Sequence, residues 1–181
     1  MYQIIVPATE LYDDQKGEFI TLKKDQSLQL EHSLVSLSKW ESKWCKPFLS
    51  KEEKTEEETL DYIRCMTITQ NVNPLVYKCL TPDNIEEIYQ YINAPMTATT
   101  FGRDDSGKRN REIITSELVY YWMISLNIPL NCQKWHLNRL LTLIRVCTVK
   151  NAPPKKRSQR EIMSQNAAIN AARRKQLNTK G

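Results

Sequence analysis

The chain has 181 residues, of which 40% are hydrophobic and 26% charged, and its formal net charge is +5. A chain of this length can bury a substantial core, since about 150 residues already bury roughly two thirds of the surface that an unfolded chain exposes. The composition is that of a folded protein that carries a polar segment, and it argues against a wholly disordered chain.

The first thirty residues favour β-structure. Residues 2–7 form a short apolar run, and two further apolar segments, 19–22 and 28–30, flank a polar stretch at residues 23–27. Two short apolar segments around a polar turn are typical of a β-hairpin. The sequence therefore predicts a small N-terminal β element in which segments 19–22 and 28–30 pair with one another.

Helical periodicity begins directly after this element. Apolar residues recur every three or four positions, which places them on one face of a helix. Ser33 is a suitable N-cap for this helix, and Pro47 ends it. The residues of the apolar face are Leu34, Leu37, Trp40, Trp44 and Phe48.

Three later positions carry the signals of helix starts. Thr55 and Glu58 form a capping-box pattern, which predicts a second helix. Asn73-Pro74 and Thr81-Pro82 each place a cap residue before a proline in the first turn, and they predict two short helices.

The strongest helical segments lie at residues 112–127 and 131–149, on either side of Pro129. Together with the earlier segments they predict a mainly α fold, or an α+β fold with the small N-terminal β element. The apolar run Leu118–Ile128 has only about half of the roughly 20 apolar residues of a membrane-spanning helix. It therefore predicts a helix of the core.

Charge divides the chain near residue 150. Residues 150–181 contain nine Lys or Arg and one acid, Glu161, so they carry a net charge of +8 while the rest of the chain carries −3. The consecutive prolines Pro153-Pro154 stop a helix and favour an extended spacer. The sequence predicts a mainly helical domain with an N-terminal β-hairpin at residues 1–150 and a basic C-terminal arm, flexible or helical, at residues 151–181.

Few residues are suited to catalysis. The two histidines, His32 and His136, lie outside any nucleophile motif, and neither a phosphate-binding glycine loop nor an HExxH zinc pattern occurs. The five cysteines lack zinc-ligand spacing and are expected to be buried, reduced thiols. The acidic cluster at residues 52–58 is expected to face solvent at the start of a helix. We expect no enzyme activity, no cofactor and no metal site.

Trp40 and Trp44 are candidate partner-binding residues. They share a helical face beside Lys39 and Lys43, and amphipathic aromatic side chains favour both protein cores and binding surfaces. Their spacing is also that of an ordinary apolar stripe. Core packing and a partner-binding groove are both open interpretations.

The basic arm carries further candidate partner-binding residues in two clusters. Its charge suits a phosphate backbone, but the arm lacks aromatic residues, so contact with nucleic acid would be sequence-independent. A helix that orders on an acidic partner and a solvated tail are the alternatives. The residues of the two clusters are Lys155, Lys156, Arg157, Arg173, Arg174 and Lys175.

Four stretches of the chain resemble a family encoded by tailed bacteriophages. The family is that of the tail assembly chaperones of long-tailed, siphophage-type phages, and the likeness spans nearly the whole chain. The stretches are residues 30–44 (LEHSLVSLSKWESKW), 60–67 (LDYIRCMT), 134–147 (KWHLNRLLTLIRVC) and 166–174 (NAAINAARR).

The resemblance implies a non-catalytic chaperone of the host cell cytoplasm. Such a protein binds the phage tape-measure protein and brings tail-tube subunits to it during virion assembly, without a membrane partner. Trp40, Trp44 and the basic arm would then contact these partners. Two alternatives stay open: a structural head-tail connector or tail component of the virion, and a sequence-independent nucleic-acid-binding protein that acts through the arm. Self-association is compatible with all three.

Overall fold

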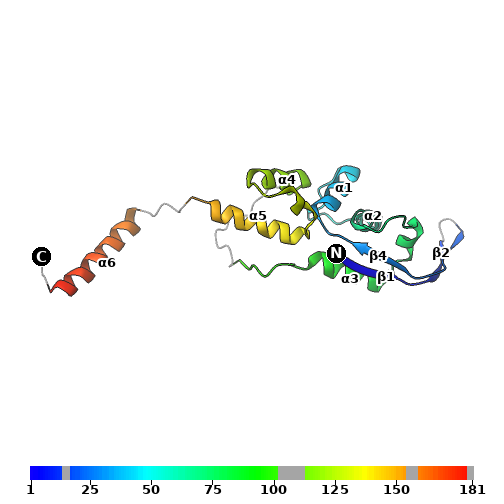
Figure 1. Ribbon diagram of the computed structural model, residues 1–181, viewed down its shortest axis with the longest axis horizontal. Helices are drawn as coiled ribbons and strands as arrows, with labels where there is room; N and C mark the ends of the chain where they lie inside the picture. The colour runs from blue at the N-terminus through cyan, green and yellow to red at the C-terminus, as the bar shows by residue number, and fades with distance from the viewer. Residues whose placement is uncertain (14–16, 102–112, 154–158, 179–181) are drawn as a thin grey trace. The chain divides into compact units, whose positions relative to one another are not determined.

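A computed structural model describes residues 1–13, 17–101, 113–153 and 159–178. The chain divides into two compact units, Met1–Thr148 and Val149–Gly181. Its described part is mainly helical with a small β element, which confirms the fold class expected from the sequence (Figure 1).

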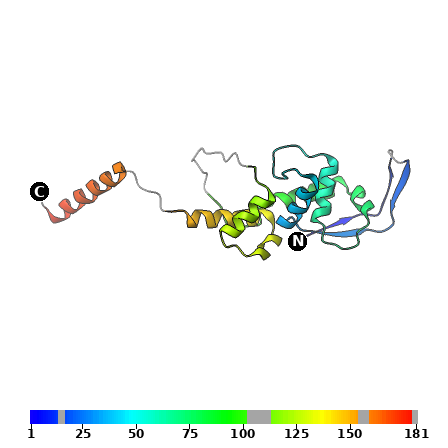
Figure 2. The same ribbon diagram turned by 90° about the horizontal axis from the view of Figure 1, so that it is seen from above.

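Four short strands form the β element of the first unit. β1 pairs with β4, with Tyr2 opposite Leu30, and β2 pairs with β3, with Thr9 opposite Leu22; both pairs are antiparallel. The two pairs follow one another along a bent ribbon (Figure 2), and the pairing register shifts by one residue between them. The strands are β1 (Tyr2–Val6), β2 (Thr9–Asp13), β3 (Glu18–Leu22) and β4 (Gln26–Leu30).

The predicted pairing of segments 19–22 and 28–30 is therefore wrong. Both segments belong to the same side of the ribbon, which is formed by β3 and β4. The polar stretch between them bends this side without reversing the direction of the chain. At the bend, the Ala8 backbone N–H donates to Asp25 Oδ1 at 2.8 Å. Pro7 lies on the other side of the ribbon, between β1 and β2. Because proline has no N–H, it interrupts the backbone hydrogen bonds between the two sides.

The inner pair of strands buries one face. Ile4 and Val6 of β1 and Leu28 and Leu30 of β4 are at most 1% exposed, while the side chains between them face outward. This alternation follows from the two-residue period of a strand. The outer edge of β4 is also paired, because the Ile68 N–H donates to the Gln29 carbonyl oxygen at 2.9 Å.

The helices that follow begin at the predicted caps. Ser33 and Thr55 each close a capping box, Asn73 accepts from the Leu75 N–H, and Thr81 closes a third capping box. These local bonds satisfy the first N–H groups of each helix. The helices are α1 (Leu34–Trp44), α2 (Glu56–Met66), the 3₁₀ helix η1 (Pro74–Cys79) and α3 (Pro82–Asn93).

The later helical segments are shorter than predicted. The segment predicted to start at residue 131 is interrupted because Leu130–Lys134 form a 3₁₀ turn after Pro129 and the next helix starts only at Leu137. The helices are α4 (Ser116–Ser125), η2 (Leu130–Lys134), α5 (Leu137–Asn151) and, in the second unit, α6 (Gln159–Leu177). All described side chains of α6 are exposed.

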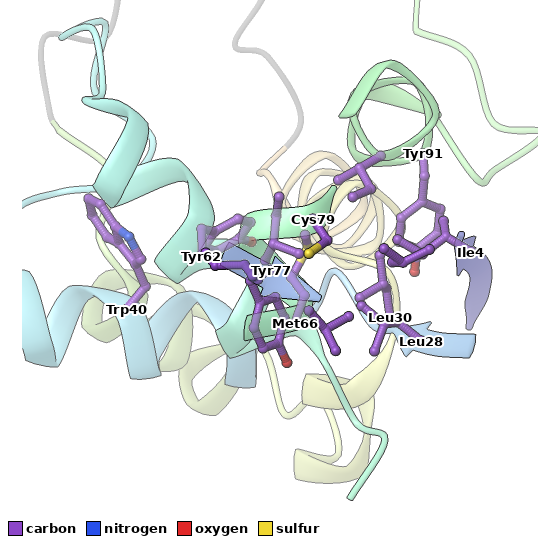
Figure 3. Packing of buried hydrophobic residues seen from close by; sticks show 14 residues of the cluster. Ile4, Leu28, Leu30, Trp40, Tyr62, Met66, Tyr77, Cys79 and Tyr91 are labelled. Atoms are coloured by element: carbon purple, nitrogen blue, oxygen red, sulfur yellow. The ribbon is translucent and has the colours of Figure 1, made fainter. Parts of the chain in front are cut away.

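The first unit contains two hydrophobic clusters. The first lies between the ribbon, α2, η1 and α3, and the second lies between α1, α4, η2 and α5. Helix α1 contributes to both, with Trp40 in the first cluster and Leu34 and Leu37 in the second. Figure 3 shows the first cluster, with labels on Ile4, Leu28, Leu30, Trp40, Tyr62, Met66, Tyr77, Cys79 and Tyr91.

Candidate partner-binding groove

Trp40 and Trp44 join α1 to α2. Trp40 is 1% exposed, and its Nε1–H donates to the Glu58 carbonyl oxygen at 2.8 Å. Trp44 is half-buried, and its Nε1–H donates to Asp61 Oδ2 at 2.9 Å. Core packing is thus the interpretation that holds for Trp40, whose ring is closed off from any partner. Trp44 keeps part of its surface, but its polar atom is already bonded within the fold.

Two ion pairs complete the seam between α1 and α2. Lys46 Nζ lies 2.5 Å from Glu58 Oε1, and Lys43 Nζ lies 2.5 Å from Asp61 Oδ1. The hydrogen bond from Lys46 holds the pKa of Glu58 below its usual value. The expectation that the whole acidic cluster faces solvent is therefore wrong for Glu58, which is 3% exposed. These two ion pairs tie the end of α1 and the residues after it to α2.

The two histidines come together at the end of the ribbon. Ser33 and His136 form an antiparallel bridge, and the rings of His32 and His136 have their centroids 4.9 Å apart. The Tyr62 hydroxyl lies 2.7 Å from His32 Nδ1, and His136 Nε2 lies 3.0 Å from the Tyr91 carbonyl oxygen. Sequence analysis missed this contact, because a bridge between residues about one hundred positions apart leaves no local signal.

Burial sets the charge of this histidine pair. His32 is 2% exposed, and burial together with the neighbouring His136 lowers its pKa to about 3. Burial also lowers the pKa of His136. Among the described residues, no Ser or Cys side chain is hydrogen-bonded to either ring. The pair is a neutral, enclosed packing element at pH 7, without the nucleophile that a catalytic histidine would activate.

An open groove lies where the outer half of the ribbon meets α2, η1 and α3. Its volume is about 820 Å³. Most of its lining side chains are aliphatic or tyrosine, and they come from five separate elements. They are Leu11, Tyr12, Ile20, Leu60, Tyr77, Leu80, Ile85 and Tyr89.

A narrow apolar pit opens beside this groove. The pit has a volume of about 60 Å³ and shares Lys54, Thr59, Ile85 and Tyr89 with the groove. Isoleucine and aromatic side chains form the rest of its wall: Phe48, Tyr62, Ile63, Ile88 and Ile92. Groove and pit together are suited to a ligand with an apolar face and one protruding side chain.

Charges of both signs border the groove. Lys54, Glu56 and Lys78 line it, and the Lys54 ammonium lies 4.7 Å from the centroid of the Phe48 ring. On the ribbon, Tyr12 is 55% exposed and pairs with the ring of Phe19 at 5.0 Å between centroids. Exposed aromatic side chains beside an apolar hollow are typical of a protein-binding surface.

The basic clusters lie in the second unit. Arg173, Arg174 and Lys175 are exposed in the last turns of α6. Lys155, Lys156 and Arg157 lie outside the described residues. Of the candidate residues in the first unit, neither Trp40 nor Trp44 lines the groove.

The described residues show no metal-binding cluster. No group of three His, Cys, Asp or Glu side chains in the described ranges is arranged to hold an ion. Cys79 and Cys132 are buried as expected, whereas Cys65 and Cys147 are half-buried. The expectation is wrong for Cys45, the C-cap of α1, which is exposed. No helix in the described part of the chain is both long and apolar enough to cross a bilayer.

Comparison with protein families, with curated proteins and with solved structures gives no match to this chain.

Proposed function

We propose that the chain is a non-catalytic binding protein that holds an amphipathic helix of a client protein in the groove. The single observation that carries this proposal is the open groove of about 820 Å³ with an apolar pit beside it. In its specific form, the proposal is a tail assembly chaperone of a long-tailed bacteriophage, with the tape-measure protein as the client and tail-tube subunits as further partners.

The lining of the groove supports a helical client. A helix with its side chains is roughly 10–12 Å wide and presents an apolar stripe at positions i, i+3, i+4 and i+7. The aliphatic lining can cover such a stripe, and the pit can take one anchoring side chain. Tyr12 and Tyr89, which are 55% and 47% exposed, add large apolar areas at a small cost in side-chain entropy.

The rim charges support a client of mixed charge. Lys54 and Lys78 can face acidic side chains, and Glu56 can face a basic one. A tape-measure protein, as the resemblance implies, is a long and partly apolar helical chain that must be kept in solution. A chaperone that covers its apolar face while leaving charged residues at the rim serves that need.

The test is co-purification of the full chain with the tape-measure protein of the same phage, followed by titration with its helical segments. Leu11→Glu and Tyr89→Glu place a charge on the groove at positions that are 41% and 47% exposed. We expect each to weaken binding at least tenfold, because a buried unpaired carboxylate is costly. The matched control is Ile68→Glu, at a 42% exposed position that does not line the groove.

Two outcomes would contradict the proposal. If the unaltered chain does not bind the tape-measure protein, that protein is not its client. If the groove variants and the control bind it equally well, the client binds outside the groove. Mass spectrometry of purified particles separates the chaperone from its rival, since a chaperone is absent from finished virions and a connector is present at a fixed copy number.

Nucleic-acid binding is the second candidate function. The observation that favours it is the +8 charge of residues 150–181 and the exposure of Arg173, Arg174 and Lys175. Such binding would lose affinity steeply as salt is raised, because counterions are released from the phosphates. A DNA affinity that is insensitive to salt would exclude it.

A further inference from the structure

One face of α2 and one face of α3 form most of the wall of the apolar pit. Helix α3 contributes side chains at positions i, i+3, i+4 and i+7, which are Ile85, Ile88, Tyr89 and Ile92. Helix α2 contributes side chains at positions i, i+3 and i+4, which are Thr59, Tyr62 and Ile63. A hole framed by side chains at this spacing is of the kind that one side chain of a further helix fills, as a knob does in a coiled coil.

Two polar side chains of the wall are already hydrogen-bonded within the fold. The Thr59 hydroxyl donates to the Thr55 carbonyl oxygen at 3.0 Å, and the Tyr62 hydroxyl lies 2.7 Å from His32 Nδ1. A polar side chain that entered the pit would therefore give up its hydrogen bonds to water without replacing them, which is costly. The anchoring side chain of a client must be apolar.

The charge beside the pit excludes a basic anchor as well. Lys54 is the only charged residue among those that line the pit, and its ammonium lies 4.7 Å from the centroid of the Phe48 ring. Neither of the two ion pairs in the described part of the chain includes Lys54. A Lys or Arg of the client at this point would meet a like charge.

The size of the pit separates aliphatic from aromatic side chains. Its volume is about 60 Å³. About 15 Å³ holds one water-sized group, so the pit has room for about four such groups, and a leucine side chain has about that many carbon atoms. An apolar cavity that takes up a benzene ring has a volume of about 150 Å³. The pit therefore fits an aliphatic side chain and is too small for an aromatic ring.

We propose that the pit selects the client helix by size: it takes one aliphatic side chain, of Leu, Ile, Val or Met, and excludes an aromatic one. Thr59 and Ile85 set this limit, because each is a half-buried wall residue that also lines the groove, one on α2 and the other on α3. The inference rests on the proposed function, since it concerns the anchoring side chain of the same client helix.

Two synthetic helical peptides of about 20 residues, with the same background of Ala, Glu and Lys, test the proposal. One peptide carries Leu at positions i, i+3, i+4 and i+7, and the other carries Phe there. In titration calorimetry, the full unaltered chain is expected to bind the Leu peptide about tenfold more tightly, because a ring overfills the pit. Apolar area alone would give the opposite order, since Phe is the larger side chain.

Changes to the two limiting residues should alter this preference in opposite ways. Ile85→Ala enlarges the pit and should strengthen binding of the Phe peptide until the preference is lost; if this variant melts below the unaltered chain, Ile85→Val replaces it. Thr59→Leu fills the pit and should weaken binding of the Leu peptide about tenfold. The matched control is Thr142→Leu. Thr142 is likewise half-buried in a helix and donates to the carbonyl oxygen four residues earlier, but it lines neither groove nor pit.

Equal binding of the two peptides by the unaltered chain would overturn the proposal. So would pit variants that leave the ratio of the two affinities unchanged. The groove itself is tested by Leu11→Glu, because Leu11 lines the groove and not the pit. If the Leu peptide binds the unaltered chain and Leu11→Glu weakens that binding, the groove is supported whatever the pit variants show. If neither peptide binds the unaltered chain, the proposed function is wrong and this inference is wrong with it.

Discussion

Tyr62 joins the polar and apolar parts of the first hydrophobic cluster. Its ring stacks on Phe48 with 3.8 Å between centroids, and its hydroxyl lies 2.7 Å from His32 Nδ1. Burial raises the pKa of the hydroxyl, so it stays protonated and can donate to the imidazole. The imidazole of His32 remains neutral because burial, and then the second imidazole of His136 beside it, lower its pKa.

Acid should therefore weaken the fold through His32. The pKa of His32 is about 3 in the folded chain and about 6.5 when unfolded, so between these values only the unfolded state takes up the proton. The contribution of neutral His32 to the free energy of unfolding is complete above pH 6.5 and decreases as the pH falls towards 3. We expect a loss of about 2 kcal/mol between pH 7 and pH 5, measured by guanidinium unfolding. His32→Gln should lose most of this dependence; an unaltered chain with equal stability at both pH values would contradict the account.

Glu41 of α1 stabilises the packing of α1 against the start of α4 by hydrogen bonds. Its carboxylate is 7% exposed, and Oε2 accepts from the Ser116 N–H at 2.7 Å while Oε1 accepts from the Phe48 N–H at 2.9 Å. The negative charge also faces the positive end of the α4 dipole. One side chain thus connects α1, the segment after it and a helix 75 positions later.

Replacing Glu41 with Ala should be costly. The change leaves two N–H groups without a partner, and each buried unpaired group costs about 1–3 kcal/mol, so we expect a loss of about 2–6 kcal/mol in the free energy of unfolding. Urea denaturation followed by circular dichroism measures it. Glu53→Ala, at an exposed position, is the control and should change stability by less than about 0.5 kcal/mol. Equal effects of the two changes would show that the carboxylate does not hold α4.

The elements that could be predicted from the sequence are those whose stabilising bonds are local. Ser33, Thr55 and Thr81 bond to backbone or side-chain groups three residues away, so each helix start is visible in a short window. The pairing of the strands could not be predicted correctly, because it depends on Ala8 and Asp25 meeting across the two sides of the ribbon. A local sequence pattern does not show with which distant strand a segment will pair.

The same distinction applies to the groove across the whole molecule. Its lining comes from β2, β3, α2, η1 and α3, and no single segment carries more than a few of its side chains. Periodicity identified apolar residues such as Leu60, but it does not tell which apolar side chains remain uncovered after the elements pack. Trp40 shows the opposite case: its residue type is suited to binding a partner, but its side chain is fully enclosed by the fold.

The positive charge of the molecule is concentrated in the basic arm, and removing this charge should leave the first unit folded. The described side chains of α6 are all exposed, so none of these side chains belongs to a core. We expect six changes to Gln to shift the melting temperature by less than about 2 °C in calorimetry. A larger fall would show that the arm belongs to the fold of residues 1–150. The positions are Lys155, Lys156, Arg157, Arg173, Arg174 and Lys175.

Helix α1 has one further consequence for the first unit. Its N-terminal half supplies Leu34 and Leu37 to one hydrophobic cluster, and Trp40 belongs to the other. Because α1 packs in both clusters, we expect the two clusters to unfold together. A client that binds only at the groove would thereby also protect the distant α4 side against unfolding, because both draw on one common unfolding equilibrium.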